Sequence, residues 1–445
     1  MTIGEEFGNE LLVNLSRRAE SLQQSLDEIS ADTPYPSEAR TALLRILRDL
    51  TIAVIRRLEE LRIGPPPPEF ATIEAPAKRL GVVLNVLFRL MESLVHSDVQ
   101  RIPSALVPAF EAIARQFVPD ALVLVQYLWH YNFGYENLSK VFRDWQTSGL
   151  PLAQPLPASL IVLGFPMSEK DNVLLQCAFA HELGHFITQS EALENTVRVT
   201  INPGLHQAIP GETRPQLFDV ILRWYREMFS DAFGLHLLGP AYFLALAEIG
   251  LQGLATPGAK HPPPYFRLTW MLELMRRLRY LDMRGNSGEL TSTGRLDPVM
   301  KEHFEAWGRF LATSPAPRLS AFYHCAIEAV KEALSNIRAE VDGIVQDKGY
   351  TAERFAVEVG PLVKRILQLV PPVDGDGVPN PSFVSILNAG WVVKSTRLND
   401  LEATVTAVDL EEKREVLRIL NGLVYKAIEY RLVRQVWARA GEAMS

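Results

Sequence analysis

The stretch CAFAHELGHFITQSE (Cys177–Glu191) places two histidines, His181 and His185, four residues apart, with Glu182 directly after the first. Residues i and i+4 of an α-helix lie on one face, so both imidazoles can reach a single metal ion. Glu182 is displaced around the helix by one residue, which lets it reach a water on that metal without binding the metal itself. The stretch therefore predicts a helix with two zinc ligands and a general base.

A catalytic zinc site has three protein ligands and one open position, so the motif needs a third ligand. Thr188 and Glu191 stand where a metzincin has glycine and its third histidine, which excludes that pattern. The downstream segment YREMFSDAFGLHL offers Glu227 as the ligand. Four residues later on the same helix face, Asp231 can accept a hydrogen bond from the far ring nitrogen of a ligand histidine.

Two other histidines, His206 and His236, are alternatives for the third ligand, although neither has the helical pairing that supports Glu227. Cys177 lies one turn before His181, where a buried core cysteine is favoured over a thiol switch. The basic run of Arg276, Arg277 and Arg279 is expected to be an exposed helix face. The segment Pro371–Phe383 has some features of a calcium loop, but its ligand order is broken, so we expect an ordinary loop.

The HELGH segment followed by E-x-x-x-D resembles the gluzincin class of zinc metallopeptidases, and EMFSDAFG is similar to the third-ligand helix of thermolysin-like enzymes. The segment KHPPPYFRL contributes His261, which precedes a proline, and Arg267. This segment resembles the His-Pro and Arg segment of the CAAX prenyl endopeptidase and bacterial heat-shock membrane metalloprotease family. The resemblance covers Ser159 to Tyr280, about a quarter of the chain.

The resemblance implies a zinc cofactor and assigns a role to each matching residue. It implies the ligands His181, His185 and Glu227, the base Glu182, the supporting carboxylate Asp231, and His261 as stabiliser of the tetrahedral intermediate. Arg267 would organise the site or the substrate, and Tyr265 in the same loop is a further candidate for stabilising the oxyanion. The strand before the HExxH helix lines the cleft in that family, so we expect Leu160–Phe165 to pair with an extended substrate.

Composition bounds the remaining function classes. The 445 residues are 47% hydrophobic and 22% charged, with a formal net charge of -7, which favours a folded chain and gives no reason to expect nucleic-acid binding. No run reaches about 18 uninterrupted apolar residues, and the start MTIGEEFGNELLVNL lacks the features of a secretory signal. Two cysteines form no disulfide framework. We expect a cytoplasmic protein without a transmembrane segment.

The pattern along the chain predicts a mainly α fold with a small α+β zincin-like core, with short strands before and after the HExxH helix and helical regions on either side. Ala158–Pro166 and the segment NTVRVTINPG are the strand candidates, Ser168 is the expected N-cap of the HELGH helix, and Pro215–Leu238 is a further helix. We divide the chain into an N-terminal helical region (1–150), a zincin-like metallopeptidase core (151–284) and a C-terminal helical region (285–445). Two apolar stripes at three-and-four spacing mark the first long helices: Leu11, Leu15, Ala19, Leu22, Leu26 and Ile29, then Leu43, Leu47, Leu50, Val54, Leu58 and Leu61.

These patterns predict a zinc-dependent endopeptidase that acts on selective intracellular proteins, with a protein or peptide as substrate. One alternative is a helical sensor or scaffold with a latent or structural zincin-like site, whose helical flanks bind a protein partner. Another is metal-dependent hydrolysis of a non-peptide bond. A structural zinc site is closed by four ligands and has no use for a base, so the presence of Glu182 favours the enzyme.

Overall fold

The computed structural model describes residues 3–31, 38–63, 70–97, 106–129, 131–147, 159–188, 214–251, 260–281, 298–313, 320–374, 377–406 and 413–444. Most of these residues are helical and a few form one small sheet, as the sequence predicts. They group into two compact units, the first from 1–107 and 118–170, the second from 108–117 and 171–445. No helix among them is long and apolar enough to cross a membrane.

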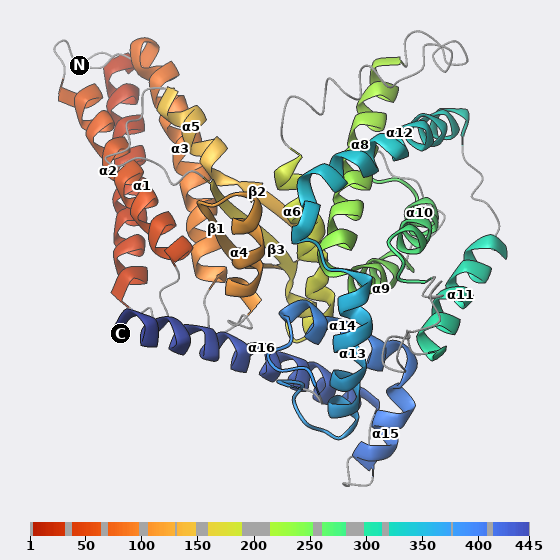
Figure 1. Cartoon of the computed structure of the whole chain (residues 1–445). Helices are drawn as coiled ribbons and strands as arrows, with labels where there is room; N and C mark the ends of the chain where they lie inside the picture. Colours follow the sequence, from red (N-terminus) through yellow and green to blue (C-terminus); the bar gives the residue numbers. More distant parts are fainter. Residues whose placement is uncertain are drawn as a thin grey trace. The chain divides into compact units, whose positions relative to one another are not determined.

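Three long helices, α1 (Ile3–Ala31), α2 (Glu38–Ile63) and α3 (Phe70–His96), run side by side in the first unit (Figure 1). Both apolar stripes predicted for α1 and α2 lie largely in the core, because their three-and-four spacing places them on one helix face. The buried members are Leu15, Ala19, Leu22, Leu26, Leu43, Leu47, Leu50, Val54 and Leu58. The predicted long helices are therefore confirmed.

The sheet of the first unit has the strand order β1-β3-β2. Strand β3 (Ser159–Pro166) is parallel to β1 (Ala121–Leu128) and antiparallel to β2 (Gly134–Asn137), which leads into helix α5 (Leu138–Thr147). Side chains that alternate along β1 and β3 belong to the same core cluster as the three long helices, so one face of the sheet is buried against them. These alternating residues are Leu122, Leu124, Leu160 and Val162.

The strand predicted at Ala158–Pro166 is confirmed as β3, but two expectations about the sheet are wrong. Strands β1 and β2 fall in a region expected to be helical, because the apolar run of β1 cannot be distinguished from a buried helix by periodicity. Over Ile161–Gly164, β3 is hydrogen-bonded on both sides. It therefore has no free edge there. The expectation that Leu160–Phe165 pairs with an extended substrate is wrong.

The regular elements among the described residues of the second unit are helices. Its elements are α4 (Leu106–Phe117), η2 (Val173–Ala178), α6 (Phe179–Ile187), α8 (Arg214–Leu238), α9 (Pro240–Gly250), α10 (Pro264–Arg277), α11 (Pro298–Thr313), α12 (Ala321–Val345), η6 (Gln346–Lys348), α13 (Ala352–Leu367), α14 (Phe383–Thr396), α15 (Leu398–Thr406) and α16 (Lys413–Met444). The helix predicted at Pro215–Leu238 is confirmed as α8.

Helix α6, which carries the HELGH motif, begins later than predicted. Ser168 does not cap it, because the short 3-10 turns η1 (Met167–Glu169) and η2 come first. Backbone groups of the buried η2 bond to side chains from distant helices. The Leu174 amide donates to the Asn421 side chain (3.4 Å), and the Trp391 indole donates to the Leu174 carbonyl (3.0 Å). The backbone groups of Leu174 thus bond to side chains of distant helices, whereas a helix that began at Ser168 would have bonded them internally.

Helix α14 also joins α8, which carries the metal-ligand candidate Glu227, to α9, the next helix. The Asn388 side chain donates to the Leu238 carbonyl (2.8 Å) and accepts from the Ala241 amide (2.9 Å). These bonds satisfy backbone groups left free where α8 ends and α9 begins. The chain turns there at Gly239, whose φ of 62° suits a residue without a Cβ.

Both predicted domain boundaries, near residues 150 and 284, lie outside the described residues, and so does the second strand candidate at 195–204. The division into three regions and the strand after the HExxH helix therefore stay predictions.

Leu84→Ala tests the core of the first unit. Leu84 in α3 is 0% exposed and belongs to the cluster beneath the sheet, so removing its side chain should lower the free energy of unfolding by about 2–5 kcal/mol. Val82→Ala, on the same helix but 57% exposed, is the control and should change it by no more than about 0.5 kcal/mol. Urea unfolding measures both, and equal effects would contradict the burial of this helix face.

Candidate metal centre

Helix α6 lies against α8 in the second unit (Figure 1). Gly184, the glycine of HELGH, permits this close approach, because an added Cβ would lie only 2.7 Å from the Cα of Ser230 in α8. A backbone atom cannot move aside as a flexible side chain can. The glycine therefore brings His181 and His185 within reach of Glu227, which precedes Ser230 by almost one turn of α8.

The three candidate ligands converge on one point. The Nε2 atom of His181 is 3.3 Å from Glu227 Oε2, and the Nε2 atom of His185 is 3.1 Å from Glu227 Oε1. One ligand atom from each of the three residues lies within 4.8 Å of the other two. Two atoms that are each about 2.0–2.1 Å from a tetrahedral ion lie about 3.3–3.4 Å apart, so the spacing fits a single metal ion.

Asp231, one turn after Glu227, supports the first histidine. Its Oδ1 accepts from His181 Nδ1 (3.0 Å) and from the Tyr242 hydroxyl (2.6 Å). Arg267 donates two bonds to the same carboxylate, from Nε to Oδ2 and from Nη2 to Oδ1, both 2.7 Å long. An ionised carboxylate only accepts, so the bond to Asp231 fixes a proton on His181 Nδ1 and leaves Nε2, which faces Glu227, as the atom that can bind a metal ion once it has lost its proton.

The buried charges of the site are balanced by these contacts. Burial alone would raise the pKa of Asp231, but the charge and hydrogen bonds of Arg267 hold that pKa well below its usual range. Burial would likewise raise the pKa of Glu227, but the charge of His181 and close contacts with the surrounding histidines hold it low. Both carboxylates are therefore ionised at neutral pH.

The compensating positive charge for Glu227 lies on His181 when no metal is bound. Burial lowers the pKa of His181, but Glu227 and Asp231 outweigh this effect and raise it to about 10. In addition, Glu227 Oε2 makes no hydrogen bond of acceptable geometry with any described residue, although His261 Nδ1 is 2.9 Å away. A buried carboxylate oxygen with an unmet bonding capacity and two imidazoles is a donor set that suits a divalent cation.

Glu182 lies beside this cluster without joining it. Its side chain is buried, and burial raises the pKa of its carboxyl group, opposed by the charges of His181 and His185. Within the described residues its carboxylate forms no hydrogen bond, in contrast to Asp231. It is thus placed near the metal ligands with its proton-accepting oxygens available to water or substrate.

The structure brings together some of the residues implied by the resemblance. His261 contacts Glu227, and its side chain is 56% exposed, so it also faces solvent. Arg267 is buried against Asp231 and lies 3.6 Å from Glu227 Oε2, so it organises the carboxylates. Tyr265 is half-buried in α10, and its hydroxyl forms no hydrogen bond with the described residues of the cluster, so its role at an oxyanion stays a prediction.

Tyr242 was not predicted from the sequence, yet its hydroxyl lies 3.1 Å from His181 Nδ1 in addition to its bond with Asp231. It belongs to α9, outside every motif, and reaches the site only because the chain turns back at Gly239. A fully buried tyrosine needs a hydrogen-bond partner. That need is a signal for a polar neighbour, but it does not identify which one.

The alternative residues lie elsewhere or outside the described residues. Both ring nitrogens of His236 are engaged, with the Ala232 carbonyl (2.8 Å) and Asp342 (2.9 Å), so it is not part of the cluster, and His206 lies outside the described residues. Cys177 is buried, and burial raises the pKa of its thiol to about 12, as suits an unreactive core cysteine. Arg276 and Arg277 pair with Glu273 on an exposed helix face.

Comparisons with known proteins identified no relative: no family model matched the sequence, and no match was found among the curated proteins or among the solved structures.

Gly184→Ala tests the close approach of α6 and α8. The added methyl group should force the helices apart, weaken zinc binding at least tenfold, and destabilise the fold by about 1–3 kcal/mol through overpacking. Gly343→Ala in α12 is the control, because its Cβ would meet nothing within 4 Å, and it should be neutral or stabilising by up to about 1 kcal/mol. Zinc titration and thermal unfolding measure both. Normal zinc affinity in Gly184→Ala would contradict the packing argument.

Tyr242→Phe tests the support of His181. Loss of the hydroxyl frees one position on Asp231 and loosens the orientation of the imidazole, so zinc affinity should fall by about 10-fold. Tyr225→Phe removes a buried hydroxyl from α8 that bonds instead to Glu340 (3.2 Å), and it should leave zinc affinity unchanged. Competition with a chromophoric chelator measures both constants, and equal affinities in the two variants would contradict a role for Tyr242.

Proposed function

We propose that this protein is a zinc-dependent endopeptidase of the gluzincin type, which hydrolyses peptide bonds of selected intracellular proteins. The proposal is carried by the convergence of His181, His185 and Glu227 in one site, with Glu182 next to the first ligand. Among the described residues, no fourth donor joins this group. Three donors with an open position are typical of catalytic zinc sites, whereas structural sites are closed by four.

Zinc held by these residues would polarise a scissile carbonyl and lower the pKa of a water molecule. Glu182 would accept the proton of the attacking water and deliver it to the leaving amine, a task that suits a carboxylate that forms no hydrogen bond with the described residues. His261, exposed beside Glu227, would donate a hydrogen bond to the developing oxyanion. Tyr265 is a second candidate for that donor.

Arg267 and Asp231 would act through the ligands and not on the substrate. Their two hydrogen bonds are buried beneath His181 and Glu227, so they hold the tautomer and orientation of the first histidine. The proposal places the protein in the cytoplasm, where its two free cysteines would stay reduced. A helical sensor or scaffold with a latent site remains the alternative, and the pairing of an open metal position with Glu182 argues against it.

The first experiment separates metal binding from turnover. Glu182→Gln should retain wild-type zinc content and lose about 10²–10⁴-fold in peptide hydrolysis, because only the proton-accepting group is removed. Glu227→Ala should instead lose zinc, because a ligand is removed. Metal content is measured on protein purified without added metal, since two imidazoles and one carboxylate also suit iron(II). Full zinc retention in Glu227→Ala would contradict its assignment as a ligand.

The substrate is then sought in cells that produce either the wild type or Glu182→Gln at equal levels. New protein N-termini found only with the wild type would support a selective endopeptidase. Their absence under resting and stressed conditions, together with no cleavage of peptide libraries by the zinc-loaded protein, would favour the latent site.

A further inference from the structure

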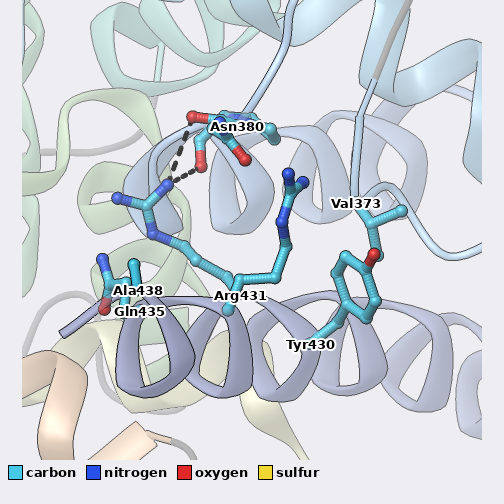
Figure 2. Close-up of a pocket in the computed structure, with 8 residues that line it drawn as sticks. Val373, Asn380, Tyr430, Arg431, Gln435 and Ala438 are labelled. Carbon is cyan, nitrogen blue, oxygen red and sulfur yellow. Dashed lines mark hydrogen bonds between the residues drawn. The ribbon is translucent and has the colours of Figure 1, made fainter. Parts of the chain in front are cut away.

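A pocket of about 330 Å³ lies between α16 and the segment that leads into α14 (Figure 2). This volume is at the lower end of the range for small-molecule sites. Asn380 and Pro381 contribute to one wall, and Tyr430, Arg431, Arg434 and Gln435 of α16 to the other. The pocket shares no residue with the candidate metal centre.

The two arginines are held in place by neutral groups. Arg431 Nη1 donates to the carbonyl oxygens of Asn380 and Pro381 (Figure 2). The guanidinium of Arg434 lies over the ring of Tyr430, 5.7 Å from its centroid. Among the described residues, no carboxylate forms an ion pair with Arg431 or Arg434.

The surrounding charges do not neutralise the pocket. Arg354 lies close enough to affect Arg431, but its own charge is balanced by Glu358, whose Oε1 is 2.7 Å from Arg354 Nε. Burial, and then repulsion from Arg354, lower the pKa of Arg431, against the opposing effect of Glu358. The pocket therefore keeps an excess of positive charge, because Glu358 is already paired with Arg354 and no described carboxylate forms an ion pair with Arg431 or Arg434.

We infer that this pocket binds a small phosphate monoester, with the phosphate oxygens between Arg431 and Arg434. The planar fork of a guanidinium matches the oxygens of phosphate, and each arginine can present two donors. A phosphate monoester carries a charge of about −1.5 to −2 at pH 7, which balances two arginines, whereas a carboxylate balances only one. The rest of the volume, beside Tyr430 and Gln435, accommodates the organic group.

The test uses the full chain and three probes: phenyl phosphate, inorganic phosphate and phenylacetate. Isothermal titration calorimetry should show phenyl phosphate binding with a dissociation constant of about 0.01–1 mM, tighter than either other probe. Arg434→Gln should weaken this binding at least tenfold. Arg434 is exposed, so this variant should fold normally, as circular dichroism would verify.

Arg418→Gln is the matched control, because it removes the same charge from an exposed position of the same helix, where Arg418 pairs with Glu415. It should change the affinity by less than about twofold, since a distant surface charge is screened by salt. No saturable binding, or equal losses in both variants, would overturn the site. Phenylacetate binding as tightly as phenyl phosphate would overturn the phosphate class, and equally tight inorganic phosphate would overturn the monoester.

Discussion

The pair of hydrogen bonds between Arg267 and Asp231 is the interaction on which the candidate metal centre depends. It is buried, and breaking a buried ion pair from one side costs about 3–5 kcal/mol because the other charge is left unpaired. The same carboxylate orients His181 and receives Tyr242. Helices α6, α8, α9 and α10 therefore meet at one charged group, and the position of each ligand follows from that meeting.

This arrangement gives different surroundings to Asp231 and Glu227, the two carboxylates that stand one turn apart on α8. Asp231 is satisfied by protein donors, whereas Glu227 faces three imidazoles and retains an oxygen without a well-formed hydrogen bond. A helix that placed two equally unsatisfied carboxylates side by side would be destabilised by their repulsion. Because Arg267 neutralises Asp231, Glu227 is the carboxylate that remains available to bind a cation.

Local sequence patterns were enough to predict the ligand candidates and the helices that carry them. They were not enough to predict the residues from other parts of the chain that support those ligands. The spacing of His181 and His185 and the downstream Glu227 and Asp231 are properties of single helices, and the structure brings these four residues together. Tyr242 and the late start of α6 were not predictable in this way, because they depend on a chain reversal at Gly239 and on bonds from Trp391 and Asn421. Strand β1 was missed because a short buried apolar run has no decisive period.

The bonds from α14 also set a time order for assembly of the site. Trp391, which holds the turn that leads into α6, follows Leu174 by 217 residues, a distance that a ribosome covers in roughly 10–40 s. Asn388, which holds the end of α8, emerges at nearly the same moment. During synthesis, the nascent chain therefore displays its histidines and carboxylates well before the helix that fixes them exists. Delayed assembly of this kind keeps the candidate metal centre of a newly made chain incomplete until Trp391 and Asn388 have left the ribosome.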